Sequence, residues 1–237
     1  MSHEHFVQLY QDSAALADAV AEYVCEGLRR GEAAVIIATA QHREAFLSRI
    51  GAFNADQLKV LDAEQTLATF LVNGIPNWQA FRATIGGLIA ELRLRYPTVR
   101  AYGEMVDVLW QRGEREAAIR LEEYWNELGQ LQTFSLFCAY RMDPLDGALY
   151  GGPLESVCRV HAHLAPARDQ QRIDAAVHEA SRKVLDQPLA AILLSMAANH
   201  GRQVPAAQAT LFWLKQNMPR AADQVFQQLK GAASREA

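Results

Sequence analysis

The chain has 237 residues, half of them hydrophobic, and a net charge of −4. This length can bury one sizeable α/β core or one domain with a small addition. The mild negative charge, without a basic face, argues against a nucleic-acid partner. No apolar run approaches the roughly 20 residues that span a bilayer. No signal peptide is evident, and three sparse cysteines are typical of reduced thiols, so we expect a cytoplasmic protein away from membranes.

Short β-branched and aromatic runs alternate with helical patterns from the amino terminus onward. The expected strands are 6–10, 34–38, 58–61, 99–102 and 133–140. The expected helices are 13–29, 41–50, 64–72, 77–96 and 114–128. This alternation predicts an α/β fold whose mostly parallel sheet is flanked by helices.

The pattern changes after Pro166. From Asp169 onward the chain is rich in Ala, Gln and Leu, with helical periodicity, breaks near three prolines and no strand pattern. We therefore expect two domains, an α/β domain over 1–166 and a helical module over 167–237.

Many α/β proteins bind nucleotides through a glycine-rich phosphate loop. GxxxxGK[ST] and GxGxxG are both absent, and Gln11–Leu16 after the first strand contains neither glycine nor lysine. Backbone amides and a lysine normally grip phosphate at that turn. His161 and His163 have strand spacing for chelation, but no CxxC strengthens a zinc site. We expect no metal, no cofactor and no catalytic residues, and keep an atypical RecA/KaiC-type ATPase as the alternative.

The segment RAYGEMVDVLW sets Glu104 and Asp107 among apolar residues. Buried carboxylates are costly unless bonded. Glu104 either binds a ligand or a polar neighbour such as His5 or Tyr140, or it caps the following turn. Asp107 is interpreted as solvated or capping.

Several strings together resemble a known family. They are His5–Tyr10, VAEYVCEGLRRGE, RAYGEMVDVLWQRGEREAAIRLEEYWNEL, FSLFCAY and VCRVHAHLAP. They resemble the MEDS family, the methanogen/methylotroph sensory domain, over roughly residues 3–166. The resemblance implies a small-molecule sensor, proposed for hydrocarbon-type ligands, and not an enzyme.

The same segment resembles a degenerate RecA/KaiC core without its phosphate loop. Such a fold leaves a crevice at the carboxyl ends of the strands, where open α/β sheets bind ligands. Glu122 and Asn126 lie one helical turn apart and can bond each other or converge on one partner, with a surface polar pair as the alternative. Cys138 and Tyr140 share a strand face. Core packing is the alternative for the aromatic residues and for Cys138. The expected ligand-binding residues are His5, Tyr10, Glu104, Trp110, Glu122, Trp125, Asn126, Cys138, Tyr140 and His161.

Lys183–Ile192 resembles the H-box of histidine kinases, and 220–229 resembles the second helix of their dimerisation hairpin. Lys183 stands where the phosphoacceptor histidine would be, and an ammonium group cannot accept phosphate as imidazole does. We therefore expect a non-enzymatic signalling protein. It would form a homodimer through a helical hairpin, with a histidine kinase or response regulator as a possible partner and a small apolar molecule as ligand. A generic helical tail is the alternative.

Overall fold

The computed structural model describes residues 4–200 and 203–236. The chain divides into two compact units, Met1–Arg141 and Met142–Ala237. The domain boundary expected at residue 166 lies inside the second unit, and it stays a prediction.

The strands of the first unit run parallel in the order β3-β2-β6-β7-β1. They are β1 (Glu4–Tyr10), β2 (Ala33–Ala38), β3 (Leu58–Asp62), β6 (Val99–Gly103) and β7 (Ser135–Arg141). All residues of the central strands β2 and β6 are buried, as expected for strands covered on both faces. The predicted α/β class with a parallel sheet is confirmed.

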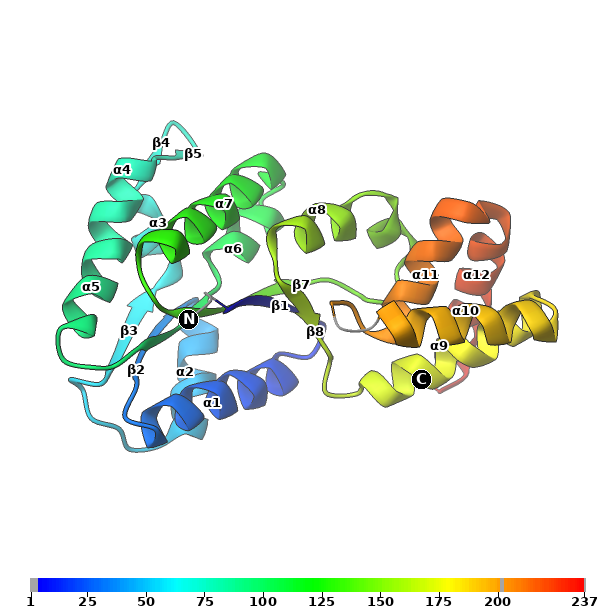
Figure 1. The fold of residues 1–237 in the computed structure, drawn as a ribbon, viewed down its shortest axis with the longest axis horizontal. Coiled ribbons are helices and arrows are strands. Elements are labelled where there is room, and N and C mark those ends of the chain that lie inside the picture. Colours follow the sequence, from blue (N-terminus) through cyan, green and yellow to red (C-terminus); the bar gives the residue numbers. More distant parts are fainter. Residues whose placement is uncertain (1–3, 201–202, 237) are drawn as a thin grey trace. The chain divides into compact units, whose positions relative to one another are not determined.

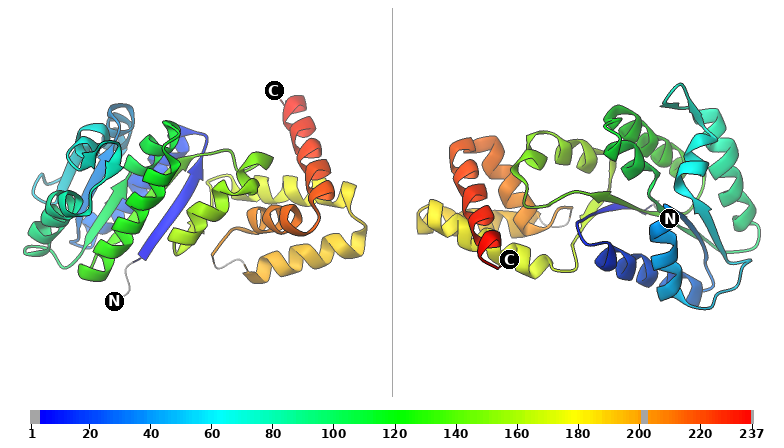
Figure 2. Two further views of the ribbon diagram at one scale, coloured as in Figure 1. Left: turned by 90° about the horizontal axis from the view of Figure 1, so that it is seen from above. Right: turned by 180° about the vertical axis from the view of Figure 1, so that it is seen from behind.

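Helices cover both faces of this sheet (Figures 1 and 2). They are α1 (Ser13–Arg29), α2 (Ala40–Ile50), α3 (Ala63–Ala68), α4 (Trp78–Phe81), α5 (Gly87–Arg93), α6 (Met105–Gln111) and α7 (Arg115–Leu131). A π-helical turn at Arg82–Gly86 joins α4 to α5, so the predicted helix 77–96 is one helix with an irregular turn.

The predicted helix 64–72 is too long. It ends at Ala68, and a small antiparallel hairpin follows, formed by β4 (Leu71–Val72) and β5 (Ile75–Pro76). Asn73 and Gly74 connect these strands with φ of 53° and 77°. Asn-Gly is the preferred pair for such a turn, because both central residues need positive φ.

Alternate residues of the strands face different helices. Tyr102 of β6 and Phe137 of β7 belong to a buried cluster with Leu16 of α1 and Phe46 of α2. On the other face, Trp125 of α7 packs edge-on against Phe81, and a Cβ on Gly103 would lie 3.6 Å from its indole ring. The side-chain period of two therefore assigns each strand residue to one of two helical layers.

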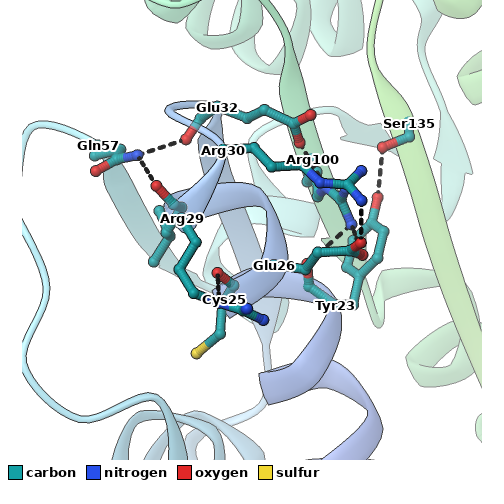
Figure 3. A network of polar contacts seen from close by, with 10 residues as sticks. Tyr23, Cys25, Glu26, Arg29, Arg30, Glu32, Gln57, Arg100 and Ser135 are labelled. Carbon is teal, nitrogen blue, oxygen red and sulfur yellow. Dashed lines mark hydrogen bonds and ion pairs between the residues drawn. The ribbon is translucent and has the colours of Figure 1, made fainter.

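A charged network closes the amino end of β6 (Figure 3). Arg100 Nε donates to Glu32 Oε2 at 2.5 Å, and Nη1 donates to Glu26 Oε2 at 2.9 Å and to the carbonyl of Tyr23 at 3.1 Å. Burial lowers the pKa of Arg100, but the bonds to Glu32 and Glu26 outweigh it and raise the pKa. Arg100 therefore stays charged and links β6 to α1.

The second unit is largely helical, as the sequence predicts. It contains α8 (Pro153–Val160), β8 (His163–Ala165), α9 (Gln170–Val184), α10 (Gln187–His200), α11 (Ala206–Asn217) and α12 (Pro219–Glu236). The glycine-rich segment before Pro153 forms a short 3-10 helix, Gly147–Gly151, and leads into α8; proline is favoured at that first helical position. Within the described ranges, no helix is both long and apolar enough to cross a membrane.

Candidate functional site

A cavity of about 640 Å³ opens at the carboxyl ends of the parallel strands in the first unit. Parallel strands all point their carboxyl ends to one edge, so residues distant in sequence meet there. Residues at or directly after the ends of β1, β2, β3, β6 and β7 contribute side chains, together with the first turns of the following helices. The polar lining includes Tyr10, Ser13, Thr39, His42, Asp62, Glu104, Asp107, Gln111 and Arg141.

Glu104 lies buried at the end of β6 and organises one wall of this crevice. Its Oε2 accepts the backbone N–H of Thr39 at 2.7 Å, and its Oε1 forms a short bond with His42 Nδ1. His42 Nε2 lies 3.1 Å from Ser13 Oγ. The carboxylate therefore bonds a polar neighbour, as one of the two alternatives predicts, but the neighbour is His42 and not His5 or Tyr140.

The chain Ser13–His42–Glu104 has the order of partners found in Ser–His–acid triads. If Nδ1 of His42 carries the proton that Glu104 accepts, Nε2 can accept the proton of the Ser13 hydroxyl. The arrangement can pass a proton between a bound molecule and the buried carboxylate. It can equally hold a ligand hydroxyl or amine at the mouth of the crevice.

Asp107 forms the second buried carboxylate of the crevice. It is 5% exposed, so its interpretation as a solvated residue is wrong. Its Oδ1 accepts the backbone N–H of Arg141 at 3.0 Å and the amide of Gln111 at 2.9 Å, and Oδ2 accepts the Tyr10 hydroxyl at 3.2 Å. The side chain ties the first turn of α6 to the ends of β1 and β7.

Burial is the largest influence on the pKa values of Asp107 and of its hydrogen-bond partner Tyr10. Desolvation raises the pKa of Asp107, and its three hydrogen bonds only partly oppose that shift. Burial and the neighbouring carboxylate of Asp107 raise the pKa of Tyr10. Tyr10 is therefore a neutral phenol that donates to Asp107 throughout the physiological pH range.

Five of the predicted site residues form a separate, buried cluster beneath α7, which we call the His5 cluster. Its members are His5 on β1, Glu122 and Asn126 on α7, and Cys138 and Tyr140 on β7. His5 Nε2 lies 3.2 Å from Glu122 Oε2 and 3.4 Å from Cys138 Sγ. Glu122 and Asn126 do converge on one partner, since Asn126 Oδ1 lies 2.9 Å from His5 Nδ1.

The remaining contacts of the His5 cluster involve Glu122. Cys138 Sγ lies 3.4 Å from Glu122 Oε2, and the Tyr140 hydroxyl donates to Glu122 Oε1 at 2.8 Å. Burial, then the nearby carboxylate, raises the pKa of Cys138 and of Tyr140. Both groups therefore stay protonated at neutral pH.

The remaining positions named from the sequence are Trp110, Trp125, His161 and Lys183. Trp125 is core, and half-buried Trp110 packs edge-on against Tyr140 with ring centroids 5.4 Å apart, outside the crevice lining. His161 ends α8, and its Nδ1 bonds the carbonyl of Val157 at 2.7 Å. Lys183 is exposed and pairs with Glu179 at 2.6 Å. Ligand binding by Trp110, Trp125 or His161 stays a prediction, as does the assignment of Lys183 to the degenerate phosphoacceptor position.

Sequence reasoning missed His42 and Ser13, and it interpreted Asp107 as solvated or capping, whereas Asp107 is buried and bonds Tyr10, Gln111 and Arg141. Ser13 and His42 both lie in the first turn of the helix that follows a predicted strand. That position is the one signal that could have found them, because parallel strands bring such residues to one edge.

The crevice and the His5 cluster both lie in a region that matches a known family. Residues 4–162 match the model of the MEDS family, described as the methanogen/methylotroph, DcmR sensory domain. No curated protein and no solved structure shows significant similarity to the chain. The family match covers well over half of the chain, including every residue of the crevice and of the His5 cluster, and the chain therefore belongs to the MEDS family of sensory domains.

Proposed function

We propose that this protein is a non-enzymatic cytoplasmic signalling protein whose α/β unit senses a small molecule in the crevice. The observation that carries the proposal is the crevice itself. It lies where open parallel sheets bind ligands, and two buried carboxylates, Glu104 and Asp107, face it within a family of sensory domains.

The lining of the crevice favours a particular ligand chemistry. Glu104, Asp107, His42 and Tyr10 offer hydrogen-bonding groups around a small space. A hydrocarbon derivative that carries an amine or hydroxyl group would satisfy them, whereas a bare hydrocarbon would leave them desolvated without new partners. We therefore infer a short-chain amine or alcohol as the ligand class.

An entirely apolar ligand would suit a second cavity better. This cavity, of about 490 Å³, lies within the second unit, and its lining includes Leu154, Cys158, Leu193, Phe212 and Trp213. It is the runner-up location for a hydrocarbon-type ligand, because apolar walls do not penalise the absence of polar groups.

We infer that the C-terminal helices transmit the signal through a homodimer, with a histidine kinase or response regulator as partner. The resemblance of Lys183–Ile192 and of 220–229 to the two helices of a kinase dimerisation hairpin supports this inference. The H-box-like segment departs from one continuous helix, because Leu185 is extended and Asp186 caps α10 through the N–H of Leu189. The module is therefore proposed as a dimerisation surface without phosphotransfer.

A second candidate function is hydrolysis of a small ester. The observation that favours it is the hydrogen-bonded chain from Ser13 through His42 to Glu104. In that function Ser13 would be the nucleophile and His42 its base.

Isothermal calorimetry with a panel of one- to four-carbon amines and alcohols tests the main proposal. We expect at least one member to bind the whole protein, and Glu104→Gln to weaken its binding by about 10- to 100-fold, the range for losing a charged hydrogen bond. Glu44→Gln is the matched control, since Glu44 is exposed on α2 outside the crevice lining. It should bind as the wild type does.

Several outcomes would contradict the sensor proposal. Equal binding by Glu104→Gln and wild type would place the ligand elsewhere, and Trp213→Ala then tests the apolar cavity. Micromolar binding of ATP with magnesium would favour the ATPase alternative. A covalent acyl adduct on Ser13 after incubation with a small ester, detected by mass spectrometry, would favour hydrolysis.

A further inference from the structure

We propose that the His5 cluster is a binding site for a zinc-class transition metal ion. The ligands would be His5 Nε2, Glu122 Oε2 and Cys138 Sγ. Imidazole, carboxylate and thiolate are all ligands that zinc accepts in proteins. The three potential ligand atoms lie within 4.8 Å of one another.

The spacing of the three atoms matches tetrahedral coordination. Zinc bonds of about 2.3 Å to sulfur and about 2.0–2.2 Å to nitrogen or oxygen, at tetrahedral angles, separate nitrogen from oxygen by about 3.3 Å and sulfur from either by about 3.6 Å. The observed separations are 3.2 Å from His5 Nε2 to Glu122 Oε2 and 3.4 Å from Cys138 Sγ to each of them. An ion fits between them with shifts of a few tenths of an ångström, and at least one position is left for a further ligand.

The atoms behind the ligands are arranged to orient them. Asn126 Oδ1 accepts a hydrogen bond when Nδ1 of His5 carries the proton, and this tautomer turns the Nε2 lone pair toward Glu122 and Cys138. Tyr140 donates to Oε1 of Glu122 and so leaves Oε2 as the oxygen that faces the other two ligands. Bonds of this kind to the outer side of each ligand are typical of metal sites.

The burial of the three ligands and the charge of Glu122 also favour a bound cation. His5 is 2% exposed, and Glu122 and Cys138 are fully buried. A divalent ion bound by these three buried side chains offsets the cost of burying the carboxylate, and on binding it displaces the Cys138 proton to solvent.

Titration of the metal-free full-length protein with Co²⁺ tests this proposal. We expect one ion per chain, visible bands of a four-coordinate ion and a near-ultraviolet charge-transfer band from the Cys138 thiolate. Zn²⁺ should displace Co²⁺ and abolish these bands. Cys138→Ser should lose the charge-transfer band, and Asn126→Ala, which keeps all three ligands, should weaken Co²⁺ binding by about 10- to 100-fold.

Cys25→Ser is the matched control, because Cys25 is a free cysteine on α1 outside the cluster. It should bind Co²⁺ with wild-type affinity and an unchanged spectrum. Circular dichroism checks that each variant is folded, and Asn126→Ala keeps the test decisive should Cys138→Ser unfold. A wild-type protein without a charge-transfer band, or folded Asn126→Ala with unchanged affinity, would overturn the proposal.

Discussion

Ionisable side chains lie at both ends of strand β6, and their hydrogen-bond partners differ between the two ends. At the amino end, Arg100 is 9% exposed and meets two carboxylates and a backbone carbonyl. At the carboxyl end, Glu104 and Asp107 are buried against a histidine, a phenol and backbone amides. One end pairs opposite charges, and the other concentrates acidic groups around a cavity.

Under the proposed function, the charged group at the amino end stabilises the fold, whereas the acidic groups at the carboxyl end bind a ligand. Arg100 has acceptors that compensate its burial, so its network stabilises the join between β6 and α1. Asp107 faces a cavity in which burial raises its pKa and a ligand could supply further compensation. Under the proposed function, the carboxyl end is therefore the place where ligand binding changes the stability of the fold.

The largest expected effect is at the amino end. Arg100→Met should lower the free energy of unfolding by about 2–4 kcal/mol, because it removes charged hydrogen bonds and leaves Glu32 partly buried without its partner. Urea denaturation measures this change. Arg95→Met is the matched control: Arg95 is exposed, its ion pairs are 3.7 and 3.8 Å long, and its loss should cost less than about 0.5 kcal/mol. Equal losses in both variants would refute a structural role for the network.

An intermediate effect is expected from a glycine that makes room for the same arginine. A Cβ on Gly27 would lie 2.6 Å from Cδ of Arg100, whose guanidinium is held by Glu26 and Glu32. Gly27→Ala should therefore lower the free energy of unfolding by about 1–3 kcal/mol through overpacking.

Gly87→Ala provides the control for that substitution. Gly87 begins α5, and nothing lies within 4 Å of a Cβ built there. In a helix, alanine is favoured over glycine by up to about 1 kcal/mol, so this variant should be neutral or stabilised in urea denaturation. Destabilisation by the same amount at both glycines would show that the arginine network is not the cause.

The smallest expected effect concerns the carboxyl end and depends on pH. Because the pKa of Asp107 is raised in the folded protein, the native state holds a proton that the unfolded chain has already released. Stability from this group is full below its unfolded pKa and is lost as pH rises through the folded pKa. The free energy of unfolding of Asp107→Asn, relative to wild type, should therefore increase with pH across that window and then level off. Thermal unfolding from pH 3.5 to 7 measures it, and a constant difference between the two proteins would contradict the shift.

Much of the fold follows from local patterns. Runs such as Ala34–Ala38 are buried strands because only a strand covered on both faces can hide every residue, and the helical spacing in 13–29 and 114–128 predicts α1 and α7 closely. The hairpin after Ala68 was missed because the helix pattern was carried through to the Asn-Gly turn. Local patterning decides the type of most elements but not every boundary.

The sequence alone also determined which side chains are candidates. Glu122 with Asn126, and Cys138 with Tyr140, follow from the helical and strand periods, which do not depend on the rest of the fold. Only the tertiary structure decided their partners: His5 meets Asn126 across 121 positions of the chain, and Glu104 meets His42 across 62. Strand order and register bring such residues together, and they arise from packing over the whole unit, which a short segment of sequence cannot specify.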